Sequence, residues 1–375
     1  MRLRQIIEDE IRRQGPISFS RYMELCLYHP EHGYYSRHAG QFGKAGDFYT
    51  SSDVHAVFGR LLARQFEQMW RVLDRPPRLE VVELGPGRGL FARDVLDWSQ
   101  KKFPEFFGAA RYVLVESSPA LRGALRERLK DQIEAGKASV VESFDSPGDV
   151  ASNVSTIVFA NEFFDALPVD VVDHRGELRV DSRDGRFVET FAAPAPGLLE
   201  SLGRYSVRPE EHERVEVSPS AIRWMERIAA RLQRGFAVLI DYGYSRAEQM
   251  AGRHRGTVMA YRQHTASDDP YAAPGEQDIT THVNFTALQA AGEAAGLEPL
   301  GFLTQSQFLI GIGEENQFAD AFEDCRMPQE QAKVALQLKH LVTPAGMGET
   351  FRVLVMARGV EKEKAARLSG LSFAR

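Results

Sequence analysis

Cysteine is scarce in this sequence: only Cys26 and Cys325 occur among 375 residues. They lie far apart and belong to no CxxC or Cys/His pattern, which argues against a zinc site and predicts a reducing compartment. No apolar run approaches the length of a membrane-spanning helix. The N-terminal stretch contains Glu8, Asp9 and Glu10, and because transit peptides avoid acids we expect a helix that begins the domain rather than a targeting segment. These observations predict a cytoplasmic protein with no metal site and no membrane insertion.

An excess of positive charge is also absent, because the formal net charge is −6 at pH 7. Proteins that bind nucleic acids neutralise phosphates with a basic face, so this balance argues against nucleic acid as a partner. The hydrophobic fraction of 43% is ordinary for a globular protein and allows a sizeable core. The length predicts that core plus one or two smaller additions.

The first 78 residues are predicted to form a region of helices and loops. Helical patterns cover residues 3–14 and 18–27 and are interrupted by Gly15-Pro16. The stretch that follows is rich in glycine and in aromatic and polar residues, and loops of this length are usually functional or disordered. Helical spacing resumes after Asp53, which together with Ser52 is a candidate cap for the next helix.

From residue 79 onward, strand and helix patterns alternate. Such alternation predicts an α/β fold with a doubly wound, mostly parallel sheet. The expected strands are LEVVEL (79–84), RYVLVE (111–116), SVVE (139–142), TIVFANE (156–162) and FAVLIDYGY (236–244). The expected helices between and after them are 90–102, 119–135, 218–234 and 284–296.

Three alternating runs interrupt this rhythm between residues 169 and 191. The turn signals Arg175-Gly176 and Asp184-Gly185 separate them, which predicts a small antiparallel meander inserted into the fold. Two further strands are expected at 298–313 and 351–359, with a helical stretch around 314–340 between them and a break at Pro328. The predicted regions are 1–78, the core parts 79–168 and 218–360, the insertion 169–217 and a charged tail at 361–375.

The turn after the first strand of the core, ELGPGRG, is the clearest candidate for ligand binding. Glycines between a strand and a helix let a ligand approach the backbone and the helix N-terminus. Gly85, Gly87 and Gly89 are spaced GxGxG rather than the GxGxxG of dinucleotide-binding proteins, and Glu83 precedes them. That carboxylate would repel a pyrophosphate and attract an ammonium group. The turn could also be only a tight strand–helix junction.

Further polar residues follow the next two strands. Glu116 ends its strand, where a carboxylate can accept hydrogen bonds from ribose hydroxyls. Ser143 and Phe144 follow the third strand and could border an adenine ring. These features together favour S-adenosyl-L-methionine as cofactor, because Glu83 can bind the ammonium group of its amino-acid end, Glu116 can bind its ribose, and it carries no phosphate. A carboxylate that ends a strand is, however, often only solvated.

The chain resembles the MidA-like, or complex I assembly factor, family of class I methyltransferases over residues 17–358. The resemblance rests on HPEHGYY (29–35), GDFYTSSD (46–53), VVELGPGRG (81–89), ANEFFDALPVD (160–170), LIDYG (239–243), DITTHVNF (278–285), TQSQFLIGIG (304–313) and MGETFRVL (347–354). It implies a Rossmann-like methyltransferase fold with an N-terminal helical lid and the insertion on the substrate side. The family pattern GDF-x-TSPE has Pro-Glu where this chain has Ser52-Asp53. Mitochondrial relatives methylate arginine on a respiratory complex subunit, which implies a protein arginine acceptor.

Several candidate site residues follow from these motifs. In NEFFDALP, Asn161, Glu162 and Asp165 come where substrates meet the cofactor in doubly wound sheets, although they could instead stabilise a turn or a helix N-terminus. Asp278 and His282 could complete the acceptor site, or Asp278 and Thr280 could cap the following helix. We also expect a lid at 40–53 in which Asp47 and Thr50 contact the cofactor.

Other functions remain compatible with the sequence. The acceptor could be a small molecule methylated on N, O or C, because a fold does not define a substrate. The protein could also be an assembly chaperone that keeps the fold without turnover. A nucleotide-dependent dehydrogenase is disfavoured by Glu83 and by the glycine spacing.

Overall fold

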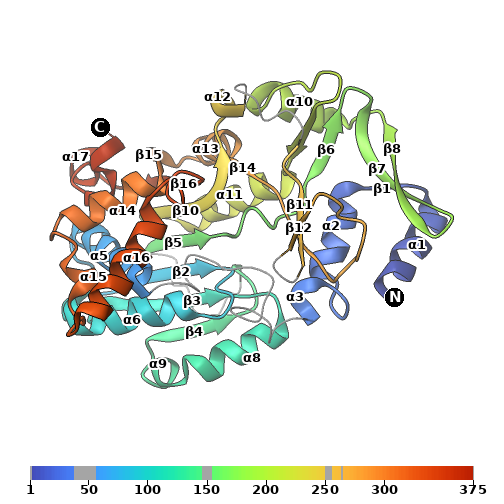
Figure 1. Cartoon of the computed structure of the whole chain (residues 1–375). Helices are drawn as coiled ribbons and strands as arrows, with labels where there is room; N and C mark the ends of the chain where they lie inside the picture. The colour runs from blue at the N-terminus through green and yellow to red at the C-terminus, as the bar shows by residue number, and fades with distance from the viewer. Residues whose placement is uncertain (1, 38–55, 146–153, 250–255, 263–264, 375) are drawn as a thin grey trace. The chain divides into compact units, whose positions relative to one another are not determined.

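A computed structural model describes residues 2–37, 56–145, 154–249, 256–262 and 265–374 (Figure 1). Its contacts divide the chain into two compact units, each assembled from three segments. Unit 1 comprises Met1–Phe48, Phe163–Glu226 and Gly243–Ala291, and unit 2 comprises Tyr49–Glu162, Arg227–Tyr242 and Gly292–Arg375. The predicted α/β class with a mostly parallel sheet and a small antiparallel sheet is confirmed.

Unit 2 is built on the mostly parallel sheet. Its strands lie in the order β15 (Glu298–Thr304), β16 (Phe351–Arg358), β10 (Gly235–Tyr244), β5 (Ser155–Asn161), β2 (Leu79–Leu84), β3 (Ala110–Val115) and β4 (Ala138–Val141). All neighbours from β10 to β4 pair in parallel, whereas β16 runs antiparallel to both of its neighbours. The central strands are buried along their length, as expected for a sheet covered on both faces.

The helices of unit 2 pack on this sheet through aromatic side chains. Phe91 stacks on Phe159 of β5 at 4.4 Å between ring centroids, and Phe66 meets both rings edge-on. The helices and the terminal 3-10 helix are α5 (Ala56–Val72), α6 (Leu90–Lys102), α7 (Pro104–Ala109), α8 (Pro119–Arg128), α9 (Lys130–Glu134), α14 (Gln305–Glu314), α15 (Ala319–Phe322), α16 (Pro328–Val342), α17 (Lys362–Ala365) and η1 (Ser369–Ala374). Helix α11 (Pro219–Arg231) begins in unit 1 and ends in unit 2.

The predicted strand at 298–313 is wrong in its second half. β15 ends at Thr304, and α14 begins at the next residue. The Thr304 side chain accepts a hydrogen bond from the Gln307 backbone N–H, and the Gln307 side chain accepts one from the Thr304 backbone N–H. This capping box satisfies two donors at the helix start, and it outweighs the apolar run that suggested a strand. Pro328 is the first residue of α16, as the predicted break requires.

Unit 1 contains the predicted meander. β6 (Asp170–Asp173), β7 (Gly176–Arg183) and β8 (Arg186–Ala192) pair antiparallel, and positive φ angles at Asp184 and Gly185 close the second hairpin. β9 (Arg214–Val217) extends the sheet beside β6, and β1 (Ile17–Ser18) pairs with β7 through Ile17 and Val180. The other elements are α1 (Arg2–Gln14), α2 (Phe19–Tyr28), α3 (Tyr34–Arg37), α10 (Pro196–Tyr205), α12 (Arg246–Gln249), β11 (Met259–Arg262), β12 (Thr265–Ser267), β13 (Asp278–Thr280), β14 (Val283–Asn284) and α13 (Phe285–Ala294).

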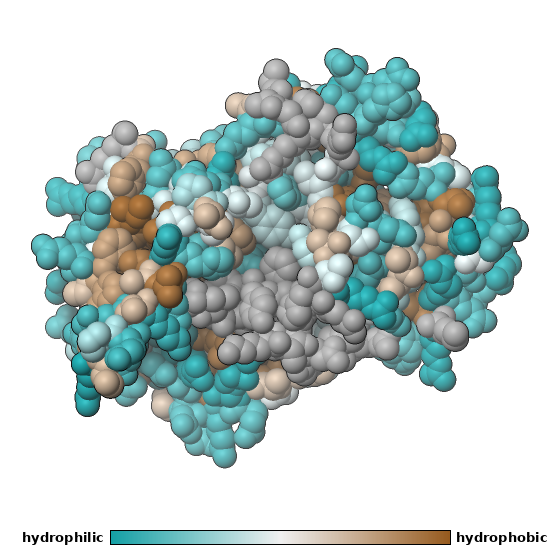
Figure 2. Space-filling view, viewed as in Figure 1, coloured by the Kyte–Doolittle hydropathy of each residue, from teal (hydrophilic) through white to brown (hydrophobic). Residues whose placement is uncertain are grey.

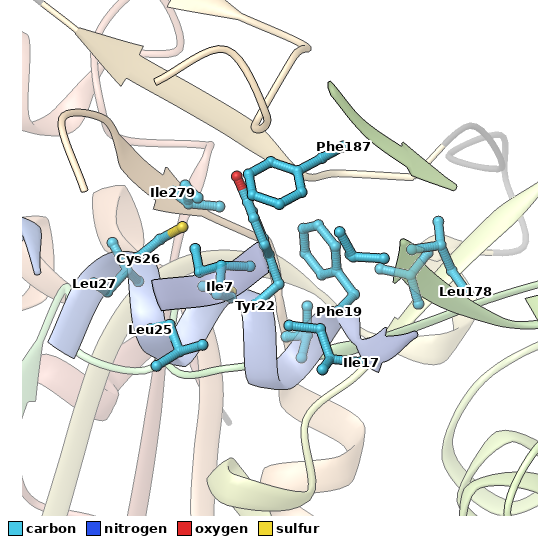
Figure 3. Close-up of a cluster of buried hydrophobic side chains, with 14 of the residues drawn as sticks. Ile7, Ile17, Phe19, Tyr22, Leu25, Cys26, Leu27, Leu178, Phe187 and Ile279 are labelled. Carbon is cyan, nitrogen blue, oxygen red and sulfur yellow. The ribbon is translucent and has the colours of Figure 1, made fainter. Parts of the chain in front are cut away.

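One apolar cluster, which we call the N-terminal core, joins the segments of unit 1. Figure 3 shows Tyr22 of α2 at its centre, with Phe187 of β8 and Ile279 beside it. The Tyr22 and Phe187 rings meet edge-on at 5.4 Å, and the Tyr22 hydroxyl donates to the Pro270 carbonyl at 3.0 Å. The cluster therefore ties the N-terminal helices to the meander and to β13.

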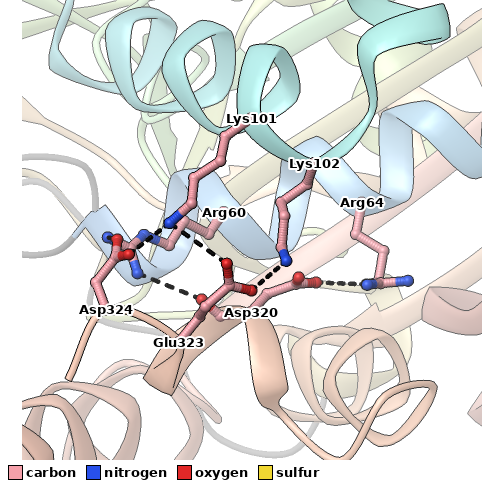
Figure 4. A network of polar contacts seen from close by, with 7 residues as sticks. All are labelled: Arg60, Arg64, Lys101, Lys102, Asp320, Glu323 and Asp324. Atoms are coloured by element: carbon pink, nitrogen blue, oxygen red, sulfur yellow. Dashed lines mark hydrogen bonds and ion pairs between the residues drawn. The ribbon is translucent and has the colours of Figure 1, made fainter. Parts of the chain in front are cut away.

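A set of charged side chains, which we call the ion-pair cluster, links three helices of unit 2 (Figure 4). Its members are Arg60 and Arg64 of α5, Lys101 and Lys102 of α6, and Asp320, Glu323 and Asp324 in and after α15. Most of these side chains are partly exposed, but that of Asp320 is buried. Of the helices in the described ranges, none is long and apolar enough to cross a membrane.

Candidate functional site

The glycine turn between β2 and α6 has the backbone that ligand approach requires. Gly85, Gly87 and Gly89 have φ angles of 62°, 51° and 70°, in the left-handed region that favours glycine. A Cβ at Gly87 would meet no atom of the described residues within 4 Å, whereas one at Gly89 would lie 2.6 Å from the end of the Leu125 side chain. A side chain at Gly89 would therefore require Leu125 to shift, while no described residue crowds Gly87. Within the described ranges, no side chain caps the N-terminus of α6 at Gly89.

Glu83 lies inside β2, two residues before this turn. Its side chain is 5% exposed, and Oε2 accepts a hydrogen bond from the Tyr112 hydroxyl on β3 at 2.9 Å. Burial raises the pKa of Glu83 to about 8, and the Tyr112 bond only partly offsets this effect. A cationic group brought near this carboxyl would favour its ionised form.

Glu116 follows β3 and is buried at the same edge of the sheet. Its Oε1 accepts a hydrogen bond from the Ser118 backbone N–H at 2.8 Å, and Ser118 in turn caps α8. Burial raises the pKa of Glu116 to about 7, with Ser118 N–H and the nearby Arg122 acting in the opposite direction. The loop thus holds the carboxyl in a defined orientation next to the glycine turn.

Ser143 and Phe144 follow β4, as expected, but their side chains face protein groups. Ser143 Oγ accepts a hydrogen bond from the Asp145 backbone N–H at 3.2 Å. The Phe144 ring is fully buried, and the Arg231 guanidinium lies over it at 4.5 Å from the centroid. This placement favours a packing role for the ring over contact with a ligand.

Asn161 and Glu162 lie where β5 ends. The Asn161 side-chain amide donates to Glu162 Oε1 at 3.0 Å, and the Glu162 backbone N–H donates to the Ile240 carbonyl on β10. Glu162 has a φ angle of 52°, which is unusual and costly for a residue other than glycine. Backbone strain of this kind is concentrated at functional sites, so the arrangement singles out the Glu162 carboxyl.

The other two predicted catalytic residues belong to unit 1. The Asp165 backbone carbonyl accepts a hydrogen bond from Thr281 N–H at 3.0 Å, which brings it to the DITTHVNF segment. In that segment Asp278 Oδ1 accepts a hydrogen bond from the Tyr35 hydroxyl at 2.8 Å. Burial raises the pKa of Tyr35, and the charges of Asp278 and Asp165 raise it further. Two buried carboxyls and a tyrosine are therefore close neighbours in unit 1.

His282 is held by a hydrogen bond of its backbone, and the centroid of its ring lies 6.5 Å from that of the Tyr244 ring. Its N–H donates to Thr257 Oγ1 at 3.0 Å, and that hydroxyl donates to Glu216 Oε2 at 3.1 Å. Neither Asp278 nor Thr280 caps α13, because both belong to β13. Instead, Asn284 Oδ1 accepts from the Ala287 N–H at the start of that helix.

The structure thus divides the predicted site residues between the units. Unit 2 brings Glu83, the glycine turn, Glu116 and Asn161-Glu162 to the carboxyl ends of three adjacent strands, the place where open α/β sheets bind ligands. Asp165 and His282 lie in unit 1. The whole of the expected lid at 40–53 lies outside the described residues, and with it Asp47, Thr50 and the candidate caps Ser52 and Asp53.

The model of a family of S-adenosyl-L-methionine-dependent methyltransferases matches residues 61–303 of this chain. The chain belongs to this family. It is also similar to the crystal structure of a Burkholderia thailandensis protein bound to S-adenosyl-homocysteine, with 30% identity and a TM-score of 0.84 over 99% of this chain and 95% of that one. The predicted family, the methyltransferase activity and S-adenosyl-L-methionine as cofactor are confirmed, and the dehydrogenase alternative is excluded.

Curated relatives of the family extend the comparison. The "Protein arginine methyltransferase NDUFAF7 homolog, mitochondrial" of Drosophila melanogaster is 31% identical over 94% of this chain and 84% of its own length. Its counterpart in Mus musculus is 29% identical over 92% of this chain and 82% of its own length. The expected cytoplasmic location is therefore wrong, because these relatives are named mitochondrial. Scarce cysteine indicates a reducing compartment but does not distinguish one such compartment from another.

Sequence reasoning missed three residues that shape these sites. The Tyr112 hydroxyl donates a hydrogen bond to Glu83. In the parallel pairing of β2 and β3, Glu83 lies opposite Leu114, and Tyr112 comes two residues earlier, so the side chains of Tyr112 and Glu83 lie on the same face of the sheet. The sequence alone does not indicate how the two strands are aligned. Tyr35 and Thr257 lie in segments interpreted as loops, where no periodic pattern indicated their partners.

Proposed function

We propose that this protein transfers a methyl group from S-adenosyl-L-methionine to a guanidino nitrogen of an arginine in a protein acceptor. The similarity to relatives named protein arginine methyltransferases, along more than nine-tenths of the chain, carries this proposal. The family resemblance further suggests a subunit of a respiratory complex as acceptor. The acidic groups at the strand ends suit a cationic acceptor.

The residues of unit 2 fit the cofactor. No described residue prevents a ligand from approaching the backbone at Gly87, Glu83 offers a carboxyl to its ammonium group, and Glu116 offers one to its ribose hydroxyls. Asn161 completes this set at the end of β5. The bound sulfonium supplies an electrophilic methyl group. The protein's own task is to position the acceptor nitrogen and to exclude water.

Glu162 is proposed to bind the guanidinium group of the acceptor arginine. A carboxylate can bind the planar guanidinium through two parallel hydrogen bonds and hold its charge away from the reacting nitrogen. The Asn161 amide holds Oε1 of Glu162, which fixes the orientation of the carboxyl. The same carboxylate can accept the proton that the nitrogen releases after transfer. Asp165 is proposed as a second acid for the acceptor, with His282 in a supporting role.

The test measures methyl transfer and cofactor binding separately. Purified protein is incubated with methyl-labelled S-adenosyl-L-methionine and a mitochondrial protein extract, and labelled amino acids are identified after hydrolysis. We expect label in methylarginine, a decrease in kcat of at least about 100-fold for Glu162→Gln, and unchanged S-adenosyl-homocysteine affinity in that variant. Gly87→Ala should instead weaken S-adenosyl-homocysteine binding. The control is Glu105→Gln, whose side chain is highly exposed.

The outcomes separate the proposed function from its alternatives. Label found only in small molecules would replace the protein acceptor with a small-molecule acceptor. Cofactor binding without any transfer would favour an assembly chaperone. Normal turnover in both Glu162→Gln and Asp165→Asn would contradict the roles assigned to these acids while leaving the family membership intact.

A further inference from the structure

A pocket in unit 1 has been assigned no ligand in the function proposed above. It encloses about 500 Å³, the open solvent at its mouth included. Its wall is formed by α10, β9, the start of α11, the segment that contains His282, and α13. All of the described lining residues belong to unit 1.

Most of the wall is apolar. The aliphatic and aromatic side chains that shape it are Phe164, Val169, Val217, Ala221, Ile222 and Leu288. A wall of this kind favours a ligand with a hydrocarbon stem, because water released from both surfaces contributes to binding. Polar residues, among them Ser201, Ser206, Ser218, Thr281 and Asn284, interrupt the apolar surface.

Glu216 supplies the charge of this pocket. It is 5% exposed, and its two carboxyl oxygens accept hydrogen bonds from the Thr257 backbone N–H at 2.7 Å and the Thr257 hydroxyl at 3.1 Å. The backbones of Glu216 and Val258 also interact with this carboxyl. All of these donors are neutral. Burial raises the pKa of Glu216 above its usual value. The carboxyl is thus held rigidly but is not neutralised by these bonds.

The charges of the lining residues are one-sided. Glu216 is the acid among the described residues of the wall, and no lysine or arginine occurs among them. A carboxyl buried without a cation gains most from a ligand that brings one, because a charge pair is stronger away from water. A hydrocarbon stem that ends in a cation matches both properties of the pocket.

We propose that this pocket binds a second arginine side chain of the protein acceptor, distinct from the one that is methylated, with its methylene stem against the apolar wall and its guanidinium on Glu216. This inference rests on the proposed function, since it gives unit 1 a part in recognising the same acceptor. Arginine is favoured over lysine because its planar group can donate two parallel hydrogen bonds to a carboxylate. The same hydroxyl of Thr257 also accepts from the His282 N–H, so the wall and the acid are held together.

The test uses n-butylguanidinium as probe, with n-pentanol as its neutral counterpart. Protein saturated with S-adenosyl-homocysteine is titrated by calorimetry. We expect the cationic probe to bind, and n-pentanol to bind at least tenfold more weakly. Glu216→Gln should weaken n-butylguanidinium binding at least tenfold. Ser201→Phe, which fills the pocket from a half-exposed position on α10, should abolish it without touching the carboxyl.

Two controls keep the result interpretable. Glu211→Gln, whose side chain is highly exposed, should bind n-butylguanidinium like the wild type. Circular dichroism of each variant verifies its fold, and Ser201→Phe decides the matter if Glu216→Gln does not fold. Binding of n-butylguanidinium that is insensitive to Ser201→Phe, or to a folded Glu216→Gln, would overturn the proposal.

Failure of this inference can be told apart from failure of the proposed function. If arginine is methylated but the probe ignores both pocket variants, only the inference fails. If the probe binds through Glu216 while no arginine is ever labelled, the pocket stands as a guanidinium site and the proposed function fails. In the methylation assay, Glu216→Gln should raise KM for the acceptor and leave kcat nearly unchanged.

Discussion

The N-terminal core of unit 1 and the ion-pair cluster of unit 2 attach helices by different means. In unit 1 the N-terminal core is apolar, and its segments come from α1, α2, the meander and β13. In unit 2 the ion-pair cluster connects α15 to α5 and α6 through charged side chains that are mostly partly exposed. Burial of apolar surface stabilises regardless of salt, whereas exposed ion pairs are weak and are screened. The ion-pair cluster, although it contains many contacts, is therefore expected to stabilise the fold less than the N-terminal core does.

The largest effect is expected in the N-terminal core. Phe19→Ala removes a buried ring that lies near Tyr22 and Tyr271, and it should lower the free energy of unfolding by about 3–5 kcal/mol. Urea unfolding followed by far-UV circular dichroism measures this loss. Phe19→Leu, which keeps most of the volume, should lose much less. Equal losses in the two variants would show that packing of the ring is not what stabilises unit 1.

An intermediate effect is expected from the buried carboxyls of unit 2. Native Glu83, with a pKa of about 8, keeps a proton that the unfolded chain releases near its ordinary pKa of 4.5. Between these values the native state binds more protons, so the contribution of Glu83 to stability falls as pH rises from about 5 to about 8. The ligand-free Glu83→Gln variant should therefore gain stability relative to wild type over this range, by at most about 1.4 kcal/mol per pH unit.

Urea unfolding at several pH values, followed by tryptophan fluorescence, measures this difference. The exposed Glu105→Gln serves as control, and its curve should run parallel to that of the wild type. A parallel curve for Glu83→Gln as well would mean that the buried carboxyl is ionised in the ligand-free protein. In that case unit 2 would hold a buried charge beside Tyr112, and the difference between an apolar core in unit 1 and mostly exposed charges in unit 2 would be smaller.

The smallest effect is expected in the ion-pair cluster. Glu323→Gln breaks ion pairs with Lys101 and Lys102 and should cost less than about 1 kcal/mol, because its side chain is 30% exposed. Unfolding in low salt and in 0.5 M NaCl measures the change, which should shrink in high salt. Asp320→Asn is the matched variant, and its cost should be larger because this side chain is buried against Arg64. A cost for Glu323→Gln that matches Phe19→Ala would reverse the comparison.

Much of unit 2 could be predicted from the sequence because its signals are local. The strand LEVVEL, the glycine turn and helix α6 are contiguous, and Gly85, Gly87 and Gly89 adopt positive φ angles that glycine allows without strain. The run at 305–313 was misassigned as strand, since short apolar segments do not distinguish a strand from a buried helix. The capping pair Thr304 and Gln307 was the signal that would have corrected it.

The polar groups of unit 1 could not be predicted, because they meet only after folding. The hydrogen bond between Tyr35 and Asp278 spans 243 positions, and the one between Thr257 and Glu216 spans 41. The sequence identified Asp278 and His282 as candidates but did not indicate their partners. Neither periodicity nor composition contains this information, since long-range side-chain contacts depend on the complete topology.

Because β1 pairs with β7, a strand from the start of the chain belongs to the same sheet as the inserted meander. Ile17 and Ser18 lie against Val180 and Arg179, more than 150 positions later. A chimera that exchanges the meander with that of a relative therefore needs the matching first 30 residues to be transplanted with it. The two segments are expected to vary together among relatives as one module, although the printed sequence separates them by half of unit 2.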